Sequence, residues 1–163
     1  MAAEYTYRVS VCWTRGRTGL AKCESSPHTI HFSEAAKLGG LEGRWTPEQL
    51  LLCALAGSFT TTFADVARGL KFDYTDLEVE IEGSVRRRGT AACDFNEILI
   101  RPRLTVNSEE QRESALNLLR HTKSVCMISR AITVPLKLEP TVETAKVLIE
   151  GWSAEDTALE LGV

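Results

Sequence analysis

The sequence predicts an α+β fold built around one long helix. Residues 46–69 form the most apolar stretch of the chain, and they begin with a capping motif that indicates a helix. Two other segments, residues 5–13 and 76–106, alternate apolar and polar side chains with the period of two that strands show. Strands therefore come in blocks separated by helices, an order typical of α+β proteins.

The N-terminal part is expected to hold two strands. The first covers residues 5–13, where one face carries Tyr5, Tyr7, Val9, Val11 and Trp13. A turn over residues 15–19 follows it. The second strand is short and covers residues 28–32. Residues 37–45 are rich in glycine, which predicts irregular structure.

The central helix is expected to begin at Thr46 and to run to residue 68. Thr46 is a natural N-cap, and Gln49 completes a capping box with it. Residues 50–59 are apolar nearly all round the helix, which is typical of a helix buried on most sides. Gly69 is the predicted C-terminal stop.

The C-terminal half predicts a hairpin, a second helix and a last strand. Residues 76–85 and 96–106 form the hairpin, and Pro102 indicates an edge strand or a bulge. The second helix covers residues 107–126, and its apolar stripe consists of Ala115, Leu118, Leu119, Thr122 and Cys126. The last strand lies within residues 131–140.

The chain of 163 residues is expected to be a single domain, residues 1–163. Its core covers about residues 5–140, and the tail, residues 141–163, is left unplaced. A helix that is apolar all round needs cover on every side, and so short a chain has few elements to supply it. A second copy of the chain is the natural cover, which predicts a homodimer.

Composition excludes several classes of partner. The chain is 44% hydrophobic and 25% charged with a net charge of −3, as in ordinary water-soluble proteins. The basic triplet at residues 86–88 is expected at a strand end, so no nucleic-acid partner is predicted. No apolar run approaches the roughly 20 residues of a membrane span, and the N-terminus lacks the features of a signal peptide. We therefore expect a cytoplasmic protein without a membrane partner.

The cysteines do not form a metal-binding pattern. Five are present, none in a C-x-x-C pair, and three histidines accompany them. They are Cys12, Cys23, Cys53, Cys93 and Cys126. The chain also lacks the glycine-rich phosphate-binding motifs and the G-x-S-x-G nucleophile motif. No metal and no cofactor are expected, and in the cytosol the thiols are expected to be reduced.

Two segments resemble one family. The stretch "GG…G…TPEQLLLCALAGSF" is similar to the central-helix motif of the OsmC/Ohr family, the osmotically inducible and organic hydroperoxide resistance proteins. The stretch "HTKSVCMISRAITVPLKLE" resembles the second cysteine segment of that family, which usually has a C-P-x-S core. The resemblance implies antiparallel sheets around a long buried helix, in an intertwined homodimer with sites at the subunit interface.

The same resemblance implies a peroxiredoxin-like activity in the oxidative stress response. In that family one cysteine attacks the organic hydroperoxide and becomes a sulfenic acid, a second resolves it as a disulfide, and a dithiol reductant is the expected partner. An arginine and a glutamate hold the attacking cysteine as thiolate. The matching positions here are Glu48, Cys126 at the resolving position, Arg17 (with Arg15 as a competitor) and Ser58 at the attacking position.

Ser58 departs from the family pattern at the position of the attacking cysteine. This departure affects the activity, because a hydroxyl cannot form a sulfenic acid. Cys53 lies about 7.5 Å along the helix and about 140° round it from this position. Met127 replaces the usual proline. We therefore expect an OsmC/Ohr-like protein whose peroxidase activity is impaired or lost. The alternatives are a peroxidase that uses Cys126, alone or with Cys53, and a non-enzymatic protein that holds a small apolar ligand.

Each of these residues also has a purely structural interpretation. Ser58 is then a helix serine bonded back to the carbonyl of Ala54. Glu48 is a first-turn carboxylate favoured by the helix dipole, and Cys126 is a small buried apolar residue. The family pattern instead predicts that Ser58 and Cys126 lie near each other. It places Glu48 and Arg17 at the same cleft, with different chains as a possible source.

Overall fold

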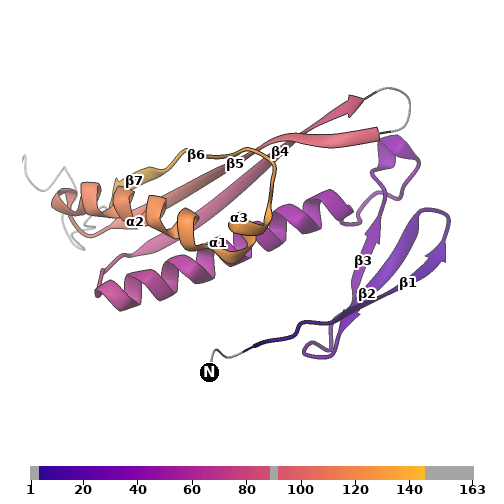
Figure 1. The fold of residues 1–163 in the computed structure, drawn as a ribbon, viewed down its shortest axis with the longest axis horizontal. Helices are drawn as coiled ribbons and strands as arrows, with labels where there is room; N and C mark the ends of the chain where they lie inside the picture. The colour runs from indigo at the N-terminus through magenta and orange to yellow at the C-terminus, as the bar shows by residue number, and fades with distance from the viewer. Residues whose placement is uncertain (1–3, 89–91, 146–163) are drawn as a thin grey trace, which may run out of the picture.

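The computed structural model describes residues 4–88 and 92–145. Two sheets and three helices make up this part of the chain. A three-stranded N-terminal sheet stands to one side, while the helices lie along one face of a longer four-stranded sheet (Figure 1). The predicted α+β class is confirmed.

The N-terminal sheet is an antiparallel meander of β1 (Val9–Arg15), β2 (Thr18–Cys23) and β3 (Ile30–Ser33). The first strand begins later than expected, and β2 overlaps the end of the expected turn and continues into residues that were assigned to no element. The turn itself is confined to Gly16 and Arg17, and Gly16 has the positive φ of 51° that a glycine tolerates. One face of β2 carries only small residues, and the other face mixes Leu20 with polar residues. Its sequence therefore shows no clear alternation of apolar and polar side chains.

Helix α1 (Pro47–Leu70) follows the short 3-10 turn η1 (Ala36–Leu38). The predicted capping box is present: the Thr46 hydroxyl accepts from the Gln49 N–H, and the Gln49 side chain accepts from the Thr46 N–H. The helix does not stop at Gly69. It ends at Leu70, because Lys71 takes the left-handed conformation and its N–H bonds to the last-turn carbonyls.

Only one stripe of α1 is buried within the chain. It consists of Leu55, Phe59, Phe63 and Ala67, so the expected burial on most sides is not found in a single chain. Helix α1 is long and apolar enough to span a membrane. The buried core helices of water-soluble proteins can have the same length and composition. By length and composition, α1 thus departs from the expectation that no apolar run approaches a membrane span.

The hairpin of β4 (Asp76–Arg88) and β5 (Ala92–Val106) is confirmed, and its turn lies outside the described residues. The two short strands β6 (Leu136–Leu138) and β7 (Thr141–Thr144) then pair with β5 in parallel. The second sheet is thus mixed rather than antiparallel. The tail prediction started at residue 141, yet β7 occupies residues 141–144, and the rest of the tail lies outside the described residues.

Pro102 lies on β5, which is a central strand and not an edge. It fits there because β6 pairs with residues 98–100 of β5 and β7 with residues 103–106. Pro102 falls between the two, where the ladder needs no N–H on that side. The irregularity of the hairpin is elsewhere, between Ser84 and Val85.

Helix α2 (Arg112–Val125) follows the 3-10 turn η2 (Glu109–Gln111), and a short helix α3 (Met127–Ala131) comes directly after it. The predicted apolar stripe of α2 is buried as expected. Helix α3 was not predicted, since the last strand was expected to begin at residue 131. The core lies where the stripes of α1 and α2 meet the inner face of β5.

Candidate thiol site

Ser58 lies in the middle of α1 on its half-buried side. Its Oγ atom is 3.2 Å from the Sγ atom of Cys126, within hydrogen-bonding distance. The neighbouring Thr60 and Thr61 bond back to helix carbonyls, at 3.0 Å in each case. Among the described residues no such bond is made by Ser58, so its hydroxyl is directed at the thiol.

Cys126 lies between α2 and α3, and its side chain is fully buried. Its N–H donates to the Thr122 carbonyl at 2.9 Å, and its carbonyl accepts from the Arg130 N–H at 3.1 Å. These bonds fix the thiol against the face of α1 that carries Ser58. The structure thus brings together residues separated by 68 positions in the chain, as their motif positions predict.

Hydrogen bonding around Cys126 lowers the pKa of its thiol. Burial raises the pKa of the Cys126 thiol, but hydrogen bonding outweighs it and holds the pKa below its ordinary value. The groups responsible are the hydroxyls of Ser129 and Ser58 and the backbone of Ser129 and Ile128. A lowered pKa increases the fraction of thiolate, which is the nucleophilic form of cysteine.

Ser129 is a site residue that the sequence analysis did not single out. It is 7% exposed, and its Oγ atom has no hydrogen-bond partner among the described residues. A thiolate at Cys126 would give this hydroxyl an acceptor, which is why it lowers the pKa of that thiol. The signal was present in the sequence, because Ser129 is the serine of the C-P-x-S core that the family usually has.

Glu48 and Arg17 do not join this site within one chain. Glu48 is exposed in the first turn of α1, about 15 Å along the axis from Ser58. Arg17 lies in the turn between β1 and β2, where its guanidinium donates to the Leu38 carbonyl at 3.0 Å and pairs with Glu34 at 3.6 Å.

Two further candidates also stay apart from the thiol site. Arg15, the competing arginine, is exposed at the end of β1. Cys53 is exposed on α1, whereas Ser58 is half-buried, so the two face different surroundings. All five cysteines are free, and within residues 4–88 and 92–145 no three metal-ligating side chains gather in one place.

A mixed sheet, a long central helix and a buried thiol that faces that helix define an α+β protein with a candidate thiol site. The family model of OsmC-like proteins matches residues 40–141, which include α1, the hairpin, α2 and the thiol. The chain belongs to the OsmC-like protein family.

Individual relatives agree with this assignment. The Bacillus subtilis (strain 168) protein YmaD is 26% identical over 146 residues, covering 86% of this chain and 97% of the relative. An organic hydroperoxide resistance protein OsmC from Legionella pneumophila superposes with a TM-score of 0.69 at 22% identity, over 87% of this chain and 99% of the other. One from Elizabethkingia anophelis gives 0.71 at 19% identity, over 89% and 100%. At these identities the solved structures show the shared fold.

Proposed function

We propose that this chain is an OsmC-like protein in which the two-cysteine hydroperoxide cycle is interrupted at Ser58. The observation that supports this proposal is the 3.2 Å contact between Ser58 and Cys126. An attacking and a resolving thiol need this proximity to form a disulfide. Here one partner is an alcohol, which cannot accept the peroxide oxygen as a sulfur does. The fold and the partner thiol are kept while the first step of the cycle has no nucleophile.

One observation favours a second candidate, a peroxidase that uses Cys126 alone. The lowered pKa of this thiol is what a nucleophilic cysteine needs. Its complete burial opposes that function, because a hydroperoxide must reach the sulfur. We therefore place the single-cysteine enzyme second and the impaired peroxidase first.

Consumption of an organic hydroperoxide distinguishes the impaired peroxidase from the single-cysteine enzyme. The wild-type chain, supplied with tert-butyl hydroperoxide and a dithiol reductant, is expected to consume peroxide no faster than Cys126→Ala does. Peroxide remaining over time is the measurement, and the rate of the reductant alone is the baseline. A wild-type rate well above baseline that Cys126→Ala abolishes would show that the single-cysteine enzyme is the correct candidate.

The complete site is proposed to need two chains. In one chain the apolar side chains of residues 5–13 stay exposed, from 60% for Val11 to 82% for Tyr7, and so does much of α1. Exposed apolar surface of this extent marks an interaction site. A partner copy would cover it and offers a route for Glu48 and Arg17 to reach the thiol site from another chain. Cys12, Cys53 and Cys93 are exposed and free, which suits the reducing cytoplasm.

The mass in solution tests the dimer. Size-exclusion chromatography with light scattering at micromolar concentration is expected to give twice the chain mass of 18.0 kDa. Trp13→Glu, which places a charge in the exposed apolar stripe, is expected to shift the mass toward the monomer. A wild-type chain that elutes as a monomer would contradict the proposed interface.

A further inference from the structure

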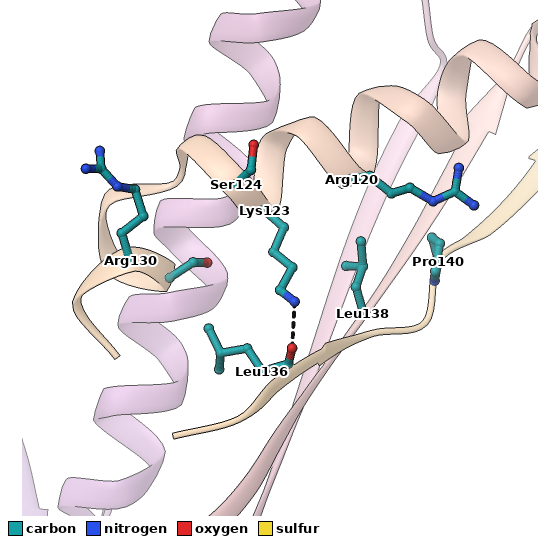
Figure 2. Close-up of a pocket in the computed structure, with 8 residues that line it drawn as sticks. Arg120, Lys123, Ser124, Arg130, Leu136, Leu138 and Pro140 are labelled. Atoms are coloured by element: carbon teal, nitrogen blue, oxygen red, sulfur yellow. Dashed lines mark hydrogen bonds between the residues drawn. The ribbon is translucent and has the colours of Figure 1, made fainter. Parts of the chain in front are cut away.

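A pocket of about 520 Å³ lies between α2, α3 and β6 (Figure 2). Its volume is within the range of small-molecule sites. None of the four residues that the family resemblance assigns to the site lines this pocket. The lining residues are Arg120, Lys123, Ser124, Ser129, Arg130, Leu136, Leu138 and Pro140. The pocket is therefore distinct from the contact between Ser58 and Cys126 but borders it through Ser129, which belongs to both.

The charge of this pocket is one-sided. Three lining residues are basic and none is acidic. Within the described residues, Arg120, Lys123 and Arg130 form no ion pair with an acidic side chain. Figure 2 shows Lys123 crossing from α2 to β6, with Arg120 and Arg130 on either side. In a chain with a net charge of −3, this local excess of cations favours an anion.

Two of the three basic side chains already make a hydrogen bond within the chain. The Lys123 Nζ atom donates to the Leu136 carbonyl at 2.6 Å, which ties α2 to β6. An ammonium group has three donors, so Lys123 keeps capacity for a ligand. The guanidinium of Arg120 donates to Asn117 on its own helix at 3.0 Å, and both arginines are exposed. In Figure 2 both guanidinium groups point outward, so a bound anion would require them to turn toward the pocket.

Ser129 links this pocket to the thiol site. It lines the pocket, is 7% exposed, and its Oγ atom is without a hydrogen-bond partner among the described residues. A buried hydroxyl without a partner costs free energy, so such groups indicate an acceptor that arrives from elsewhere. While Cys126 is a neutral thiol, an anionic oxygen in the pocket would provide that acceptor.

Three of the remaining lining residues are apolar and indicate that the ligand has an apolar part. Leu136, Leu138 and Pro140 form an apolar wall along β6 and the residues after it. An inorganic anion would leave this wall in contact with water. We propose that the pocket binds a small amphipathic organic anion, with a carboxylate held by the three cations and Ser129 and an apolar chain packed against β6. The fork of an arginine matches a carboxylate in both geometry and charge.

Titration of the full chain with three probes tests this site. The probes are octanoate below its micellar concentration, the uncharged octanol, and acetate, which lacks the apolar chain. Octanoate is expected to bind in isothermal titration calorimetry, with octanol and acetate at least about tenfold weaker, because one lacks the charge and the other the apolar area.

Variants locate the binding. Arg120→Gln and Arg130→Gln are each expected to weaken octanoate about five- to tenfold, and Ser129→Ala is expected to weaken it also. Arg86→Gln, an exposed arginine on β4 outside the pocket, removes the same charge and is expected to leave binding unchanged. Three results would each overturn the proposal: no octanoate binding, octanol binding as tight as octanoate, or equal losses in Arg86→Gln and Arg130→Gln.

Discussion

Ser58→Cys is expected to raise the rate of tert-butyl hydroperoxide consumption on the order of a hundredfold over the wild-type chain. Removal of a catalytic nucleophile from an enzyme costs ~10⁴-fold or more, and a restored nucleophile in an otherwise retained site should recover part of that. The substitution exchanges one atom, oxygen for sulfur, at the position where the OsmC/Ohr family has its attacking cysteine. Only sulfur can take the peroxide oxygen and become a sulfenic acid.

The geometry around Ser58 is prepared for this exchange. The Oγ atom already lies 3.2 Å from the Cys126 sulfur, and a disulfide needs about 2.05 Å between sulfur atoms. A small movement of either side chain therefore closes the bond. The hydrogen bonds around Cys126 lower the pKa of its thiol, which increases the fraction of thiolate that can attack the sulfenic acid.

A matched control separates the position from the mere presence of a thiol. Thr61→Cys adds a cysteine on the same helix, three residues further on and exposed to solvent. It is expected to give no comparable gain in peroxide consumption, and the natural exposed Cys53 is expected to give none in the wild type. Equal rates in Thr61→Cys and Ser58→Cys would mean that the contact with Cys126 is irrelevant. No gain in Ser58→Cys would indicate that the site has been repurposed for binding.

The parts of the fold that the sequence predicted well have strong local signals. Thr46 and Gln49 mark the start of α1 because each satisfies a backbone group of the other. The end of the same helix was misplaced, since Lys71 takes a left-handed conformation that usually indicates glycine. Strand β2 was missed because its pairing with β1 and β3 stabilises it more than its own composition does.

The candidate site, like the fold, could be predicted from the sequence only in part. The contact between Ser58 and Cys126 followed from motif positions, although no periodicity links residues 68 positions apart. The places of Glu48 and Arg17 depend on how chains assemble, which a single chain does not contain. The basic pocket was not visible in the sequence, because its residues come from α2, α3 and β6 and only the fold brings them together.

Addition of Cys126→Ala to Ser58→Cys is expected to stop the restored cycle. Without the second thiol the sulfenic acid has no partner at disulfide distance. Excess peroxide then converts it to a sulfinic acid, which a dithiol does not reduce. The double variant should lose turnover within a few cycles, while Ser58→Cys alone should continue until the reductant is exhausted.

Mass spectrometry distinguishes the two fates of the sulfur at position 58. Ser58→Cys treated with one equivalent of peroxide is expected to lose two hydrogens and to link the peptides that contain residues 58 and 126. The double variant is expected to gain two oxygens on the first peptide when peroxide is in excess. Cys53 is a natural internal reference, because it lies on the same helix, is exposed and has no thiol partner among the described residues. If the double variant turned over as steadily as Ser58→Cys, the external dithiol would be the resolving thiol, and Cys126 would have only the structural role of a small buried residue.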